Sequence, residues 1–152
     1  MGGKESKEPV AKYGLLKHYV GDDIIFQPVA APDGSLLAPR NATFIFLHDH
    51  GQNPQMYIDT FMVKASNKIF GFDKLVHVVA VQAPIVIEET EKKGRRCAWM
   101  TQGQDLMQSQ GYAYVQQIIE REIQAMGGRA DKLFIGGVGV GGHIAILSGF
   151  YS

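Results

Sequence analysis

Short apolar runs alternate with amphipathic stretches along this chain. Three runs are rich in β-branched and aromatic residues and too short for helices, which is typical of strands buried on both faces. They cover residues 43–47, 74–81 and 132–135. Apolar positions with helical spacing occur in residues 54–68, 106–126 and 144–150. Buried strands that alternate with helices predict an α/β fold, in which a mostly parallel sheet carries helices on both faces.

Three further segments complete the pattern. Residues 10–20 form a short amphipathic stretch that ends at Gly21. Residues 24–31 are expected to be extended, because apolar residues there lead through a proline to further apolar residues. Residues 85–104 show no clear period and contain the charged run 88–96, so they predict a long irregular loop with a solvated charged part.

Composition supports one folded domain. The chain has 152 residues, of which 45% are hydrophobic, enough to bury a core. We divide it into an N-terminal extension, residues 1–22, and one partial hydrolase-like domain, residues 23–152. Fifteen basic residues balance fifteen acidic ones, so no nucleic-acid partner is expected. The single cysteine, Cys97, cannot form an internal disulfide, which is consistent with a reducing, cytoplasmic environment.

The N-terminus carries a candidate lipidation signal. Residues 1–7, MGGKESK, match the N-myristoylation pattern, with Gly2 as the acceptor and Ser6 at the required position. A flexible polar start without lipid is the alternative interpretation. One myristoyl chain binds membranes weakly and reversibly, and no second signal is evident nearby. We therefore expect a cytoplasmic protein that associates at most weakly with membranes or resides in a large intracellular assembly.

The strongest chemical signal is the glycine-rich turn after the last apolar run. Gly137, Gly139 and Gly141 lie between the predicted strand and helix, and Gly142 follows. A Gly-x-Ser-x-Gly turn in this context is a nucleophile elbow, whose glycines permit a strained turn and a close approach of strand and helix. Gly137 and Gly141 occupy the two glycine positions. Gly139 occupies the nucleophile position and offers neither hydroxyl nor thiol.

Beyond this turn, residues 42–150 resemble the acyl-protein thioesterase and phospholipase-carboxylesterase family of α/β-hydrolases. Residues 44–51, FIFLHDHG, are similar to the family's apolar strand and His-Gly-x-Gly loop. Residues 82–84, QAP, with Trp99 downstream, are similar to its His-Ala-Pro and Ser-Trp segments. Residues 118–142 are similar to its helix, strand and Gly-Phe-Ser-Gln-Gly-Gly turn. The order and spacing of all three blocks agree with the family.

The resemblance implies a chemistry and the positions that serve it. In the family a serine attacks an ester or thioester carbonyl, assisted by a histidine and an aspartate. The two backbone N–H donors of the oxyanion hole then correspond to Val140, after the nucleophile position, and to His50 in the early loop. Backbone donors outlast the loss of the serine. Trp99 corresponds to a residue that lines an acyl groove, and an ordinary core tryptophan is the alternative.

Departures from the family pattern argue against catalysis. Gly139 lacks a hydroxyl, and Asp49 stands where the family's loop has glycine. The family's aspartate and histidine lie on later segments that this sequence lacks, and His143 has no serine to serve. We therefore expect no catalytic residue, cofactor or metal, and a truncated α/β-hydrolase-like fold used as a binding or structural subunit. The free apolar edge of strand 133–135 predicts a protein partner that covers it.

The glycine turn leaves two alternative functions open. One is an active or partial serine esterase or thioesterase, which the glycine at position 139 argues against. The other is a nucleotide-binding module, because Gly137, Gly139 and Gly142 also match Gly-x-Gly-x-x-Gly between a strand and a helix. The ribose-binding acid of such a module is expected about 20 residues further on, and the sequence ends first.

Two other groups invite chemical interpretations. His48 and His50 follow a strand with the spacing of a metal pair, and structural loop histidines are the alternative. Cys97 follows Arg95 and Arg96, whose charges would lower a thiol pKa and favour a nucleophile. A structural cysteine without an assigned base is the simpler interpretation.

Overall fold

The structure, a computed structural model, describes four segments of the chain. They are residues 15–28, 42–57, 76–92 and 94–151. The candidate lipidation signal at Gly2 lies outside these segments, as do most of the predicted helix 54–68 and the start of the predicted strand 74–81. No helix within the four segments is long and apolar enough to cross a bilayer.

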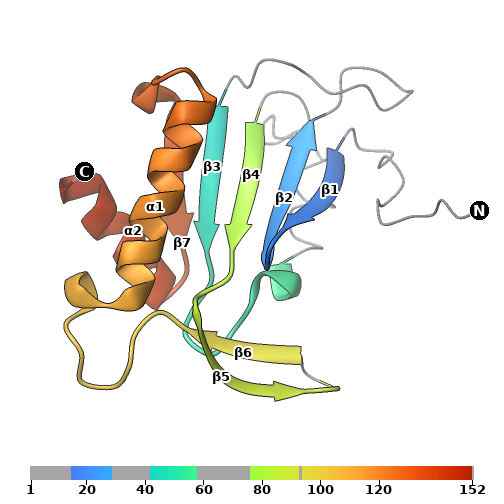
Figure 1. The fold of residues 1–152 in the computed structure, drawn as a ribbon, viewed down its shortest axis with the longest axis vertical. Helices are drawn as coiled ribbons and strands as arrows, with labels where there is room; N and C mark the ends of the chain where they lie inside the picture. The colour runs from blue at the N-terminus through green and yellow to red at the C-terminus, as the bar shows by residue number, and fades with distance from the viewer. Residues whose placement is uncertain (1–14, 29–41, 58–75, 93, 152) are drawn as a thin grey trace, which may run out of the picture.

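A mixed five-stranded sheet forms the centre of the described structure (Figure 1). Its order is β1-β2-β4-β3-β7, with β1 (Leu15–Val20), β2 (Asp23–Pro28), β3 (Ala42–Leu47), β4 (Val76–Val81) and β7 (Leu133–Gly137). β3 is parallel to β4 and β7, whereas β2 is antiparallel to β1 and β4. The predicted α/β class is confirmed. The expected parallel pairing is met in part, because the β1–β2 hairpin adds two antiparallel pairs to the two parallel ones.

The β1–β2 hairpin also changes the interpretation of the first segment. Residues 15–20, expected within an amphipathic stretch ahead of the domain, form an edge strand of the same sheet. Gly21 stands in the two-residue turn with a φ of 62°, a conformation that glycine adopts without strain. The sheet therefore extends across the boundary predicted between residues 22 and 23.

The described part of the chain also contains two α-helices and three 3-10 helices. They are α1 (Gln110–Ala125), α2 (Val140–Tyr151), η2 (Pro54–Tyr57), η5 (Leu106–Gln108) and η6 (Ala130–Lys132). The predicted helix 106–126 is divided at Ser109, whose hydroxyl accepts a hydrogen bond from the Tyr112 N–H at 3.1 Å and caps α1. α2 begins before the predicted residue 144, because close packing at the turn overrides the low helix propensity of its glycines.

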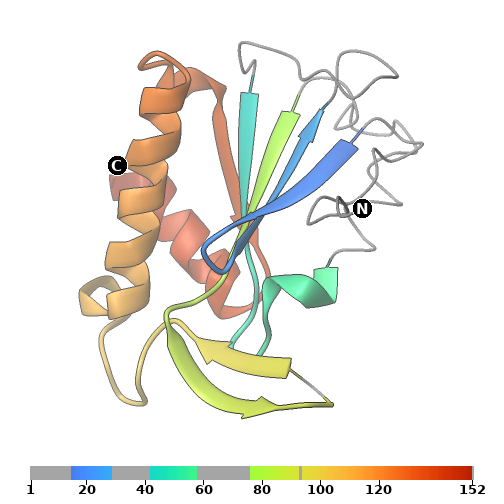
Figure 2. The same cartoon turned by 45° about the vertical axis from the view of Figure 1, so that its right-hand side comes forward.

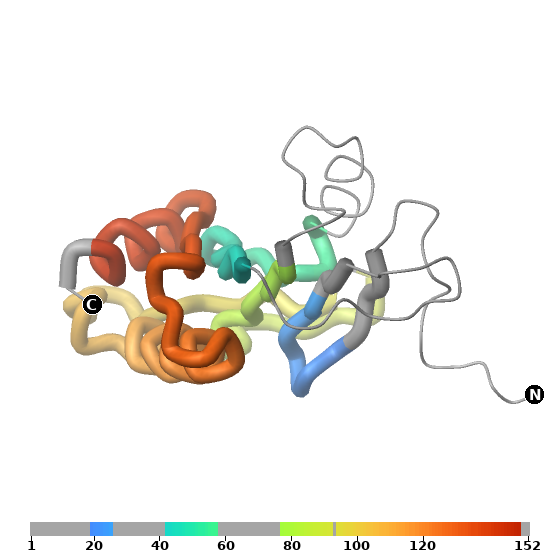
Figure 3. The backbone as a smooth tube through the Cα atoms, turned by 90° about the horizontal axis from the view of Figure 1, so that it is seen from above, coloured from blue at the N-terminus to red at the C-terminus, as the bar shows by residue number. Residues whose placement is uncertain are grey.

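Both faces of β3 and β4 are buried, as their apolar runs predict. The prediction that strand 132–135 is also buried on both faces was wrong, because β7 has no buried residue and Phe134 is 55% exposed. One face packs with α1 and α2 in a cluster that includes Ile45, Leu47, Val79, Val81, Val115, Ile118, Ile144 and Ala145. The opposite face forms a smaller cluster of Ile24, Phe46, Val78 and Ala80 with Phe44 and Tyr57. Viewed from above, α1 and α2 gather at one end of the molecule, away from the blue β1–β2 hairpin (Figure 3). Both α-helices contribute buried residues to the first cluster.

A two-stranded hairpin lies below the carboxyl ends of β3 and β4 (Figure 2). It consists of β5 (Ile85–Thr90) and β6 (Gly94–Ala98), so the predicted irregular loop over 85–104 was wrong in this part. The charged run forms cross-strand ion pairs, Arg95 with Glu89 and Arg96 with Glu88, each at 3.2 Å. β5 is almost entirely exposed, and charged residues in both strands leave no apolar alternation by which a half-buried strand would be recognised.

Candidate functional site

The turn after β7 has the backbone of a sharp strand-to-helix corner. β7 ends at Gly137 and α2 begins at Val140. Gly139 between them has a φ of 56°, in the left-handed region that favours glycine. The Val138 N–H donates to the Leu47 carbonyl at 3.0 Å, which ties the corner to the end of β3. The corner thus lies where open α/β sheets bind ligands, at the carboxyl ends of neighbouring parallel strands.

Close packing explains the glycines that flank the corner. A Cβ atom on Gly137 or on Gly141 would lie closer than 3.0 Å to the carbonyl oxygen of Leu47. A Cβ atom on Gly142 would meet the Gly137 carbonyl oxygen at 3.0 Å. Side chains at these positions would push β7, α2 and the end of β3 apart. The predicted close approach of strand and helix is therefore confirmed, because only glycine fits at positions 137 and 141.

Asp49 provides the main contact of the candidate site. Its Oδ1 accepts hydrogen bonds from the His50 N–H at 2.7 Å and from the Val140 N–H at 3.0 Å. These are the two backbone donors that the sequence assigned to an oxyanion-type cradle. The structure brings them together, and they converge on the chain's own carboxylate. Asp49 stands where the similar family has glycine, and no local pattern predicts its contact with α2.

The same carboxylate occupies the space beside Gly139. A Cβ atom on Gly139 would lie closer than 3.0 Å to the Cγ and to both carboxylate oxygens of Asp49. Real Cβ atoms essentially never come so close to other heavy atoms. The side-chain position at the centre of the corner is thus filled by a residue from the loop after β3.

His48 holds this loop in place from the core. The ring is fully buried, with Nδ1 2.7 Å from the Asp49 carbonyl oxygen and Nε2 accepting from the Ala83 N–H at 3.0 Å. This pattern requires the neutral ring with the proton on Nδ1. Burial lowers the pKa of His48, and the neighbouring Asp49 opposes that shift in part. Both ring nitrogens are engaged, which leaves no lone pair for a metal and supports the structural interpretation of His48.

Trp99 packs against His48 and belongs to the core. Its side chain has no solvent exposure, and Nε1 donates to the His48 carbonyl at 2.7 Å. The two ring centroids are 5.0 Å apart. The expectation that Trp99 lines an open groove is therefore not met, because the indole is enclosed and its one donor is satisfied.

Gln52 and Tyr57 fix the other side of the loop. The Asp49 N–H donates to Gln52 Oε1 at 3.1 Å, and the Tyr57 hydroxyl donates to the same oxygen. Burial raises the pKa of Tyr57, with a further contribution from the charge of Asp49. The carboxylate of Asp49 therefore extends from a loop whose backbone and neighbours are held on several sides.

The remaining candidate groups have no reactive arrangement among the described residues. Cys97 is fully buried in β6, and burial raises its pKa although Arg95 lowers it. The thiolate that a nucleophile requires is thus disfavoured. His143 is exposed on α2. Across the four described segments, no three His, Cys, Asp or Glu side chains are grouped to hold a metal.

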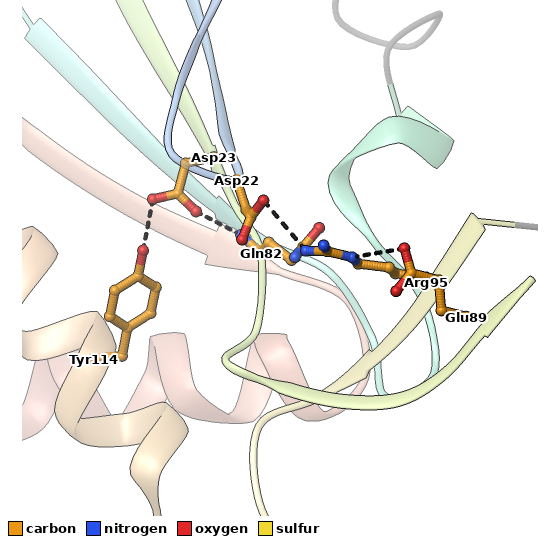
Figure 4. A network of polar contacts seen from close by, with 6 residues as sticks. All are labelled: Asp22, Asp23, Gln82, Glu89, Arg95 and Tyr114. Atoms are coloured by element: carbon orange, nitrogen blue, oxygen red, sulfur yellow. Dashed lines mark hydrogen bonds and ion pairs between the residues drawn. The ribbon is translucent and has the colours of Figure 1, made fainter.

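A second carboxylate, that of Asp23 at the start of β2, forms hydrogen bonds to the segment after β4 and to α1 (Figure 4). Asp23 Oδ1 accepts from the Gln82 N–H at 2.8 Å, and Oδ2 accepts from the Tyr114 hydroxyl at 2.8 Å. Burial raises the pKa of Asp23, against the two hydrogen bonds. Desolvation and the nearby Asp23 raise the pKa of Tyr114 to about 12.

An ion pair between Arg95 and Asp22, at 3.3 Å, joins the β1–β2 turn to the β5–β6 hairpin.

Two open pockets adjoin the corner. One, of about 550 Å³, runs along β7 and α2 and is lined by Ile135, Gly136, Gly137, Gly139, Gly142, His143, Ala145 and Ile146. The other, of about 580 Å³, lies at the β5–β6 hairpin and is lined by His50, Ile85, Ile87, Ala98, Met100 and residues 101–103. Neither is enclosed by protein on all sides.

No model of a known protein family matches this chain, and neither a curated protein nor a solved structure matches it.

Proposed function

We propose that this chain is a catalytically inactive relative of acyl-protein thioesterases and carboxylesterases that serves as a binding or structural subunit of a larger assembly. One observation carries the proposal. The corner with the shape of a nucleophile elbow has glycine at its centre, and the Asp49 carboxylate fills the space of the missing side chain. A covalent acyl intermediate needs a nucleophile at that point, and the corner offers none. The family's sheet with helices on both faces is part of this proposal.

The free edge of β7 supports the assembly role. Among the described strands β7 pairs with β3 alone, and its five residues include no charge and no proline. Phe134 is 55% exposed, and Ile146 on α2 beside this edge is 59% exposed. Native proteins usually blunt such an edge or cover it with another element. A protein partner that pairs with or packs over this edge fits these features.

A fluorophosphonate probe tests the absence of catalysis. Because no serine stands at the corner, the full chain should show no more labelling than heat-denatured chain, while an active serine hydrolase in the same tube is labelled fully. Robust covalent labelling would contradict the proposal. Size-exclusion chromatography with light scattering tests the assembly role, and a monodisperse monomer that stays soluble at high concentration would count against a needed partner.

The nucleotide-binding alternative meets an electrostatic objection. A phosphate at Gly137, Gly139 and Gly142 would face the Asp49 carboxylate, which already accepts from the Val140 N–H at the start of α2. Like charges at this distance repel, and the N–H donor is already engaged. Isothermal titration with ATP and NAD at millimolar concentration should show no saturable binding, and saturable binding would revive this alternative.

The expected membrane association rests on Gly2 and is tested separately. Metabolic labelling with a myristate analogue should mark the wild-type chain and spare Gly2→Ala. Because one acyl chain binds weakly, we propose a mostly cytoplasmic distribution with a small, salt-insensitive membrane fraction. Equal labelling of both chains would remove the lipid from the proposal.

A further inference from the structure

The Asp49 side chain links the loop after β3 to the start of α2. Asp49 Oδ1 accepts from the N–H groups of His50 and Val140 at 2.7 and 3.0 Å. His50 is its sequence neighbour, whereas Val140 lies 91 positions away. The carboxylate thus joins two distant segments and satisfies the first backbone donor of α2, where a negative charge is favourable.

The corner accepts this carboxylate because position 139 is glycine. Any side chain there would begin with a Cβ atom closer than 3.0 Å to three atoms of the carboxyl group. Moving Asp49 aside would remove both of its hydrogen bonds at once. Asp49 and a side chain at 139 are therefore mutually exclusive in this backbone.

We propose that Asp49 is a built-in autoinhibitory contact that closes the cradle of the corner from within. Its carboxylate takes the volume of a nucleophile side chain, and it occupies both N–H donors that would hold an external oxyanion. One carboxylate thus blocks both a nucleophile side chain at position 139 and the binding of an external oxyanion. This inference deepens the proposed function at the same site, and it adds that restoring a serine alone cannot reopen the corner.

A double-mutant cycle between Asp49 and Gly139 tests the steric half of the proposal. The chains are wild type, Gly139→Ser, Asp49→Gly and the double variant. Gly127→Ser is the matched control, because Gly127 also has a positive φ, 70°, and a Cβ atom there would meet nothing within 4 Å. The control measures the backbone cost of serine in the left-handed region without any clash.

Urea unfolding gives the folding equilibrium constant of each chain. In the wild-type background, Gly139→Ser should lower that constant about 10- to 100-fold more than Gly127→Ser does, the range expected of an overpacked site. In the Asp49→Gly background, Gly139→Ser and Gly127→Ser should cost the same within roughly threefold. An equal cost of Gly139→Ser in both backgrounds would overturn the steric half.

If Gly139→Ser does not fold in the wild-type background, the cycle still decides. A folded double variant then supports the proposal, because removal of the carboxylate alone restores room for serine. A double variant that also fails to fold, beside a folded Asp49→Gly chain, overturns it.

Amide resonances of His50 and Val140 test the closed cradle without any serine. In Asp49→Gly, hydrogen exchange at Val140 should speed up on the order of tenfold, because a charge-assisted hydrogen bond is lost. Asp105→Ala is the matched control, since Asp105 accepts from the Met107 N–H at 3.1 Å and lies outside the corner. This control should leave the Val140 exchange rate unchanged. Equal rates at Val140 in wild type and Asp49→Gly would overturn the hydrogen-bonding half.

Sodium formate tests whether the contact excludes an external anion. It should shift the His50 and Val140 amide resonances of Asp49→Gly and leave those of wild type in place, with sodium chloride at equal ionic strength as the reference. The proposal is overturned if the variant responds no more than wild type. Fluorophosphonate labelling would contradict the absence of catalysis instead, so the two proposals fail by different measurements.

Discussion

Asp23 and Asp49 each accept two hydrogen bonds near the same end of the sheet, in different surroundings. Asp23 is 1% exposed and binds the Gln82 N–H and the Tyr114 hydroxyl, which joins β2, the end of β4 and α1. Asp49 is partly exposed and binds two backbone N–H groups at a corner open to solvent. The carboxylate of Asp23 therefore stabilises the core, whereas that of Asp49 occupies a pair of backbone donors that could otherwise bind a ligand.

Alanine substitution at Asp23 and at Asp49 should give the largest difference in unfolding free energy between the two sites. Asp23→Ala leaves two buried donors without an acceptor and should cost roughly 3 kcal/mol of unfolding free energy. Asp49→Ala leaves donors that water can reach and should cost about 1 kcal/mol, as for loss of a helix cap. Urea unfolding at pH 7 measures both, with the exposed Asp105→Ala as a surface control. Equal losses at positions 23 and 49 would contradict a difference between the two aspartate environments.

Tyr114→Phe separates the hydrogen bond of Asp23 from its burial. It removes one donor to the buried carboxylate and keeps the ring, so a loss of about 1–2 kcal/mol is expected at pH 7. The folded pKa of Tyr114, about 12, lies above its ordinary value of 10.0. Its contribution to stability is thus complete below pH 10 and is lost as pH rises through 12. Wild type should lose stability over that interval, and Tyr114→Phe should lose less.

Acid should affect the two aspartate environments in opposite directions. The pKa of His48 is lowered below 6.5, so its contribution to stability is complete above pH 6.5 and is lost as pH falls through the folded value. The pKa of Asp23 is raised above 3.8, so its contribution is present at acid pH and is lost as pH rises through the folded value. The loop that carries Asp49 should therefore loosen first in acid.

His48→Gln tests whether protonation of His48 destabilises the protein in acid. Glutamine keeps an acceptor for the Ala83 N–H but does not titrate, so the variant should lack the part of the acid destabilisation that begins near pH 6.5. Unfolding midpoints between pH 8 and pH 5 measure it. The same slope in wild type and variant would assign the acid loss to another group.

Arg95→Ala should have the smallest effect. Its ion pairs with Asp22 and Glu89 are exposed, and exposed pairs contribute little. The hydrogen bond from Asn53 Nδ2 to the Arg95 carbonyl, 2.6 Å, survives the substitution because it uses the backbone. No change in the urea midpoint should be resolved. Asn53→Ala, which removes that bond at a buried side chain, is the matched variant expected to lose stability.

Local pattern was sufficient for the central strands and insufficient for the rest of the sheet. β3 and β4 lie at the centre of the described sheet, and β7 is its last strand. Each was recognised from a short, mainly apolar run. β6 carries two arginines and a glycine, so its strand signal depends on pairing with β5 and on the burial of Cys97. β1 shows the same problem, since it becomes a strand through its pairing with β2.

The sequence alone determined that the corner has no nucleophile, because Gly139 is glycine in any conformation. The resemblance to the hydrolase family implied the two backbone donors, Val140 after the nucleophile position and His50 in the early loop. Only the tertiary structure decided what those donors bind. The Asp49 carboxylate reaches Val140 across 91 positions of sequence, and no local period or motif encodes a contact of that range. The empty position and the group that fills it become one feature only after the chain has folded.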